Sequence, residues 1–241
     1  MRNRAPGRKA VTEQANPFVE MFMDPARVAR YSEGPLNYVP GFNDLHRMIV
    51  VLMRENAPPF ANILVHGAGG GLELDVFART NPDWSFVGID PAKPMLDAAA
   101  ERLEGVMDRI ELHHGYIDDA PDGPFDAATS LLTLHFLDAD ERQRTMNEIV
   151  RRLKRRAPLI VAHSSFPSGH AERKTALSRY RDFAITSGVE ADMAQQAMEA
   201  VSTLLPNVAP EENMEMMRQA GLKNVTSFYT GFSWHGWIGY A

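Results

Sequence analysis

Short apolar runs alternate along the chain with segments whose apolar residues repeat at helical spacing. The runs have the length and branching of buried strands. The pattern predicts a strand, turn and helix over 62–79, further strands at 84–89, 110–113, 127–132 and 159–163, and helices at 94–104 and 139–155. Alternating strands and helices indicate an α/β fold, a doubly wound, mostly parallel sheet with helices on both faces.

The two ends of this alternating region carry extra elements. Helices are predicted at 17–23, 25–31 and 40–53, a helical insertion at 166–205, a helix at 211–220, and two final strands at 222–229 and 233–240 that pair as an antiparallel hairpin. The sheet would then have seven strands. We expect one domain over 17–241, with the helices of 17–56 and of 166–205 forming a cap, and a disordered basic tail over 1–16.

A glycine turn follows the first predicted strand. Gly67, Gly69 and Gly71 allow positive φ angles and a close backbone approach to a ligand. The helix that begins there would offer unpaired N–H groups. The next strand ends at Asp90, where a carboxylate in a doubly wound sheet accepts hydrogen bonds from ribose hydroxyls. Together the two features predict a nucleoside-binding site.

The glycine spacing excludes two common alternatives. A dinucleotide fingerprint would need a third glycine at Leu72, which disfavours a nicotinamide dehydrogenase, and a phosphate-binding Walker loop would need a lysine. The stretches 63–71 and 87–99 instead resemble the first two motifs of class I S-adenosylmethionine-dependent methyltransferases. The resemblance implies S-adenosylmethionine as cofactor. The cofactor-binding residues expected on this basis are Gly67, Ala68, Gly69, Gly71, Asp90, Pro91, Tyr116, Ile117, Leu131 and Phe42.

A looser resemblance, over most of 25–222, is to the carboxy-S-adenosylmethionine synthases of tRNA wobble-uridine modification. Several functional positions of that subgroup differ here. Where the subgroup has an acid two residues before the first glycine, this chain has Val65. Where the subgroup has an acid facing the adenine, this chain has Tyr116, and the subgroup's asparagine after the fourth strand is replaced by Leu131. The arginine that pairs with the extra carboxylate falls near Met198. An unpaired buried carboxylate is costly, which argues against carboxy-S-adenosylmethionine as ligand.

Composition narrows the class of protein. Of the 241 residues, 44% are hydrophobic and 23% charged, as in globular proteins, and no apolar run approaches the length of a membrane helix. The absence of cysteine excludes disulfides and thiol chemistry, and a cytoplasmic location is expected. The net charge of −6 makes a nucleic acid substrate unlikely, and the basic run 151–156 is interpreted as structural.

Candidates for chemistry follow the fourth and fifth strands. His135 and His163 are the candidate catalytic bases, each weighed against a structural role. Tyr31 and Tyr38 could fold over the cofactor, and the aromatic strand 233–240 could line the acceptor pocket or a homodimer contact. No metal site is expected, because adjacent residues such as His113 and His114 face opposite ways on a strand.

The sequence therefore predicts S-adenosylmethionine-dependent methyl transfer to a small-molecule acceptor. Methyl transfer depends mainly on holding the nucleophile and the methyl group in line, so the lack of an obvious catalytic triad does not oppose it. Two alternatives stay open: a tRNA-modifying enzyme related to carboxy-S-adenosylmethionine synthase, and a degenerate, non-catalytic member of the fold.

Overall fold

The computed structural model describes residues 17–241. The predicted tail 1–16 lies outside them. The sheet has seven strands in the order β3-β2-β1-β4-β5-β7-β6, and only β7 runs antiparallel to its neighbours. The strands are β1 (Asn62–His66), β2 (Ser85–Asp90), β3 (Ile110–His114), β4 (Ala127–Leu131), β5 (Pro158–Ser164), β6 (Lys223–Gly231) and β7 (Trp234–Tyr240). The predicted fold class and the final hairpin are confirmed.

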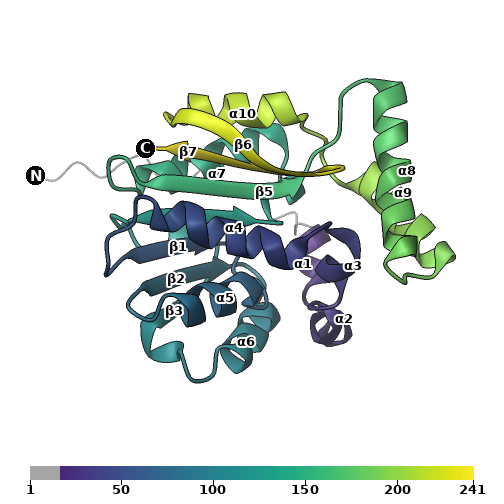
Figure 1. Cartoon of the computed structure of the whole chain (residues 1–241). Coiled ribbons are helices and arrows are strands. Elements are labelled where there is room, and N and C mark those ends of the chain that lie inside the picture. Colours follow the sequence, from purple (N-terminus) through teal and green to yellow (C-terminus); the bar gives the residue numbers. More distant parts are fainter. Residues whose placement is uncertain (1–16) are drawn as a thin grey trace, which may run out of the picture.

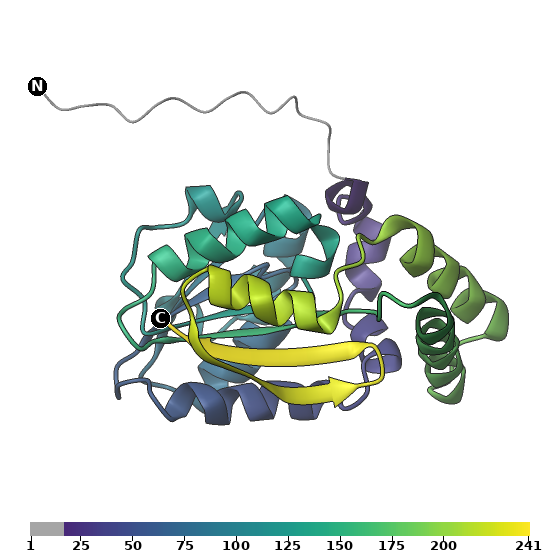
Figure 2. The same ribbon diagram turned by 90° about the horizontal axis from the view of Figure 1, so that it is seen from above.

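Helices cover both faces of the sheet (Figures 1 and 2). One buried cluster joins the sheet to α4 (Phe42–Arg54), α5 (Leu72–Thr80) and α6 (Lys93–Arg102), and a second joins the other face to α7 (Ala139–Arg151) and α10 (Pro210–Gln219). β1, β4 and β5 are buried on both faces, as parallel central strands are. None of the helices within residues 17–241 has the length and hydropathy that crossing a bilayer requires.

The remaining helices gather at the carboxyl ends of the parallel strands. They are α1 (Pro17–Met21), α2 (Pro25–Arg30), α3 (Gly34–Tyr38), α8 (His170–Thr186) and α9 (Ala191–Leu204). In Figure 1 they stand beside the end to which the β5 arrow points, with α8 and α9 projecting from the body. Within residues 17–241 there are also three single turns of 3-10 helix, at Met107–Arg109, Ile117–Asp119 and Leu134–Phe136.

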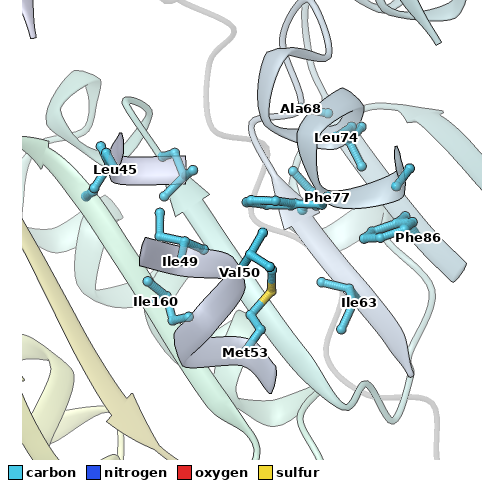
Figure 3. Packing of buried hydrophobic residues seen from close by; sticks show 14 of the residues in the cluster. Leu45, Ile49, Val50, Met53, Ile63, Ala68, Leu74, Phe77, Phe86 and Ile160 are labelled. Atoms are coloured by element: carbon cyan, nitrogen blue, oxygen red, sulfur yellow. The ribbon is translucent and has the colours of Figure 1, made fainter. Parts of the chain in front are cut away.

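The predicted cap is therefore smaller than 17–56 plus 166–205. Helix α4 belongs to the sheet layer: Leu45, Ile49 and Met53 are fully buried and pack with Ile63 and Ile160 (Figure 3). Its apolar residues follow the helical period, which fits a helix covering a sheet as well as one covering a site.

Helix α7 ends at Arg151 and not at residue 155. The basic run after it has structural partners. Arg152 is 2% exposed and donates to the carbonyl of Pro121, while Lys154 pairs with Asp126 at 2.7 Å. The backbone of Lys154 donates to Phe125 O, so the chain has already turned back towards the sheet.

The packing of α4 gives a stability prediction. Met53→Ala should lower the free energy of unfolding by about 2–5 kcal/mol, because it opens a cavity in a fully buried layer. Val51→Ala on the same helix, where the side chain is 58% exposed, should change it by less than about 0.5 kcal/mol. Urea unfolding followed by circular dichroism measures both, and equal effects would contradict this placement of α4.

Candidate functional site

Parallel pairing of β1 with β2 brings the two predicted nucleoside-binding features together. The register aligns Val65 with Gly88 and His66 with Ile89, so the glycine turn after β1 lies beside the residue that ends β2. Asp90 then connects the two directly. Its Oδ2 accepts from Gly69 N at 2.9 Å and its Oδ1 from Ala92 N at 2.8 Å.

The electrostatics of Asp90 follow from this position. Burial raises the pKa of its carboxyl, and the two backbone N–H groups and His114 oppose that rise. A carboxylate has about four lone-pair positions, so two bonds to the backbone leave capacity for ribose hydroxyls. Asp90 thus both holds the glycine turn and faces the cavity described below.

The glycine turn is shaped by contacts on both sides. Gly67 has φ +75°, and a Cβ there would lie 2.0 Å from Thr133 Oγ1. Gly67 N and Ala68 N both donate to Ile89 O, and Gly71 N donates to Ala68 O. These three amides therefore serve the turn itself.

A cavity of about 1490 Å³ opens above the turn, at the carboxyl end of the sheet. Pockets for drug-sized ligands measure roughly 300–1,000 Å³, so this cavity is larger than one such ligand needs. Of the predicted site residues it is lined by Gly67, Gly69, Asp90, Pro91, Tyr116, Ile117 and His135. Their role in cofactor binding stays a prediction, but the structure places all of them on the wall of one cavity.

Five predicted site residues do not line this cavity, each for a packing reason. Ala68 is fully buried and its methyl lies 3.0 Å from where a Gly88 Cβ would be. Gly71 abuts Ala99 of α6, and Leu131 lies in the core. Phe42 packs on His46 in α4 with ring centroids 4.5 Å apart.

His163 is the fifth predicted site residue that does not line the cavity. It is 1% exposed, and its Nε2 lies 3.1 Å from Asn213 Oδ1. That oxygen also accepts from Arg142 Nη1 at 2.9 Å, so His163 must be the donor in its own contact. Burial and the charge of Arg142 hold the pKa of His163 well below its usual range. His163 ties β5 to α7 and α10 in a buried polar network.

His135 lines the cavity but is arranged as a hydrogen-bond donor. Its Nδ1 accepts from the backbone N–H of Ser164 at 3.3 Å. A neutral imidazole that accepts at one nitrogen carries its proton on the other, so Nε2 presents N–H. Burial, helped by the charge of Arg142, lowers the pKa of His135 to about 3. The expected general-base role would need the opposite tautomer.

Aromatic rings from distant segments form one part of the cavity wall. Tyr38 of α3 stacks on Tyr180 of α8 with centroids 5.2 Å apart, and Tyr180 lies 6.3 Å from Trp234 of β7. Trp234 in turn lies 5.9 Å from His135. We call Tyr38, Tyr180, Trp234 and His135 the aromatic chamber.

Tyr31 covers the glycine turn. Its hydroxyl would lie 3.3 Å from a Cβ on Gly69, and its ring 3.1 Å from one on Gly70. Phe22 packs edge-on against both Tyr31 and Phe136, each at 5.9 Å. The sequence predicts Tyr31 and Tyr38 as residues that fold over the cofactor. In the structure Tyr31 covers the glycine turn, whereas Tyr38 belongs to the aromatic chamber.

Comparison with known proteins agrees with this geometry. Residues 63–156, from β1 to the turn after α7, match the family model described as a methyltransferase domain. This part of the chain is therefore similar to a methyltransferase domain. The recognition made from the glycine turn and Asp90 is confirmed, and with it S-adenosylmethionine as the cofactor of the domain.

Proteins similar to this chain at low identity cover more than nine tenths of it. The carboxy-S-adenosyl-L-methionine synthase of Staphylococcus epidermidis is 21% identical over 228 residues, covering 93% of this chain and 96% of that protein. A putative O-methyltransferase from Nostoc punctiforme superposes with a TM-score of 0.65 at 18% identity, covering 96% of this chain and 62% of that one.

Human N-acetylserotonin methyltransferase, solved in complex with SAM, superposes with a TM-score of 0.63 at 12% identity, covering 92% of this chain and 58% of that one. The chain thus spans about three fifths of the length of these two structures. At these identities the superpositions establish the shared fold.

Sequence reasoning missed Glu73 and the way Thr133 packs against Gly67. Glu73 is 6% exposed in the first turn of α5, where a charged residue is ordinarily solvated. Nothing in its sequence context marks it as buried, because Glu is common in the first turn of helices.

Asp90 gives the prediction for this site. Asp90→Ala should weaken cofactor binding by about 1–3 kcal/mol, because ribose hydroxyls and Gly69 N lose their acceptor. Asp97→Ala, an exposed carboxylate paired with Lys93 on α6, serves as the control. Isothermal titration with S-adenosylhomocysteine compares the two, and unchanged affinity in Asp90→Ala would remove Asp90 from the site.

Proposed function

We propose that the protein transfers the methyl group of S-adenosylmethionine to an uncharged aromatic small molecule. The observation that carries this proposal is one continuous cavity that joins the glycine turn and Asp90 to the aromatic chamber. A methyl donor at the turn and a planar acceptor in the chamber would be adjacent. Positioning of this kind supplies much of the rate of a bimolecular transfer.

Different residues of the cavity fit the binding of the cofactor and the binding of the acceptor. Gly67, Gly69 and Asp90 would hold the nucleoside and methionine parts of S-adenosylmethionine, which supplies an electrophilic methyl group when bound. Tyr38, Tyr180 and Trp234 offer planar faces to an aromatic acceptor, for which offset or edge-on ring packing is favourable. His135 Nε2–H would orient the acceptor by donating to an oxygen or nitrogen on it.

Charge in the cavity supports an acceptor that is not an anion. The acidic residues on its wall are Asp90, Asp118, Asp119, Asp138, Asp140 and Glu141. Arg144 is the basic side chain on the wall, and it already pairs with Asp118 at 2.8 Å and Glu141 at 2.9 Å. An anionic acceptor would face uncompensated repulsion, and so would an RNA phosphate backbone.

A second candidate is an activity like that of the carboxy-S-adenosyl-L-methionine synthases, favoured by similarity along nearly their whole length. The cavity offers it little support. Arg179 of α8 is exposed, and Arg181 pairs with Asp182, so neither supplies a buried cation for an extra carboxylate. Mass analysis of the reaction products separates the two candidates, since only the second leaves a carboxylated cofactor.

The first test is binding. Calorimetry with S-adenosylmethionine and S-adenosylhomocysteine should give micromolar affinities for both, because turn, carboxylate and cavity are in place. Incubation of the protein and S-adenosylmethionine with a panel of phenols, aryl amines and heteroaromatics should then yield S-adenosylhomocysteine with at least one compound. No binding of either cofactor form would support the degenerate alternative.

The tautomer of His135 gives a second, independent test. With an acceptor found in this way, His135→Phe should raise KM, because the donor is lost, while His135→Gln, whose amide also donates, should restore part of it. The pH profile of kcat/KM should show no ionisation of His135 between about pH 5 and 8, since its pKa lies near 3. A unit slope below pH 7 that disappears in both variants would make His135 a base.

A further inference from the structure

The ring of Tyr31 lies directly on the glycine turn. Its hydroxyl oxygen would be 3.3 Å from a Cβ on Gly69, and one of its ring carbons would be 3.1 Å from a Cβ on Gly70. Carbon atoms in contact stand about 3.5–4.0 Å apart. The ring therefore packs on this backbone through the space that two missing side chains leave, and no ligand atom fits between the ring and Gly69–Gly70.

The turn beneath the ring is held from other directions. Asp90 Oδ2 accepts from Gly69 N at 2.9 Å, on the side of β2. On the side of α6, Arg102 Nε donates to Gly70 O at 2.9 Å. These bonds fix the backbone of the turn. A ligand that lies on Gly69 and Gly70 can therefore make room by moving Tyr31, and much less by moving the turn.

Tyr31 itself is held by packing and by contacts within its own segment. Its backbone N donates to Val28 O, and Phe22 N donates to Val19 O, both inside residues 17–31. The ring of Phe22 packs edge-on against it, with centroids 5.9 Å apart. Within residues 17–241 no hydrogen bond joins the Tyr31 hydroxyl to another group. A ligand that hydrogen-bonds to the turn or to Asp90 thus competes with a packing contact alone.

Open space lies next to Tyr31 away from the turn. A second cavity, of about 740 Å³, adjoins the first. Phe22, Tyr31, Gly34, Pro35 and Tyr180 line both cavities, so these residues separate the two spaces. The ring of Tyr31 can therefore leave the turn without entering the packed core.

We propose that Tyr31 is a gate at the cofactor end of the cavity, which rests on the glycine turn and must swing towards the second cavity before S-adenosylmethionine binds. This inference rests on the proposed function and deepens it, because it adds a control step to the same site. Ser32 and Glu33, in the turn between α2 and α3, are where the chain would rotate. The affinity of the cofactor is then reduced by the fraction of molecules in which the gate is open.

Removal of the ring separates a gate from a lid that packs on the bound cofactor. If the gate is open in roughly 10% of molecules or fewer, Tyr31→Ala should tighten S-adenosylhomocysteine binding about tenfold or more in calorimetry. Tyr31→Phe keeps the ring and should bind as the wild type does. Tyr240→Ala, at the end of β7 and outside both cavities, is the matched control and should leave the affinity unchanged.

Movement of α2 gives a second readout that leaves residue 31 as it is. Helix α2 lies beside α6 (Figure 1). Because the chain has no cysteine, Ala29→Cys on α2 and Ala100→Cys on α6, both exposed, would carry the only two spin labels. Double electron–electron resonance should show the distance between them lengthen when S-adenosylhomocysteine is added. The pair Thr80→Cys and Ala100→Cys, on α5 and α6, is the control and should show no change.

The outcomes are distinct. If neither the wild type nor Tyr31→Ala binds S-adenosylmethionine or S-adenosylhomocysteine, the proposed function fails. Binding by Tyr31→Ala that is tighter than wild type, or that appears where the wild type shows none, supports the gate. If the wild type binds and Tyr31→Ala binds equally or more weakly, only the gate is overturned. A distance between α2 and α6 that stays the same when the ligand binds would overturn it too.

Discussion

The parallel pairing of β1 with β2 is the constraint on which the site depends. It sets the end of one strand against the end of the other, so that a turn without side chains and a carboxylate come within hydrogen-bond distance. Gly88 in the middle of β2 helps to fix this contact. A Cβ there would lie 3.0 Å from the Ala68 methyl and 3.1 Å from Leu74, which shows how closely turn, strand and helix approach.

The two halves of the cavity are built on different physical principles. The half beside the glycine turn uses the backbone and the Asp90 carboxylate at the edge of a sheet layer. Helices α4, α5 and α6 pack on one face of that layer, and Figure 3 shows the packing of α4 and α5. The half that we propose for the acceptor uses aromatic rings brought from α3, α8 and β7. Its shape is therefore set by contacts between segments that are distant in sequence, and much less by any one motif.

This difference explains what the sequence could predict. The sheet, its hairpin, the glycine turn and Asp90 follow from local spacing, which is visible in one chain. The extent of the cap does not, because the apolar stripe of α4 looks the same whether it covers a sheet or a site. Motif position alone predicts Phe42, Leu131 and Ala68 at the site. Phe42 instead packs on His46, and Ala68 packs against Gly88. His135 was identified by position, but its protonation is set by the Ser164 amide, a contact between β5 and the turn after β4.

The stacking of Tyr38 on Tyr180 has a consequence for how such proteins diversify. It is one of the contacts by which the projecting helices α8 and α9 touch the body of the molecule (Figures 1 and 2). If the acceptor binds in the aromatic chamber as proposed, exchange of α8 and α9 for another insertion would alter which acceptors fit, while the glycine turn and Asp90 would keep their arrangement. Under the proposed function, acceptor selectivity would thus be a separable property, set by an insertion and not by the sheet.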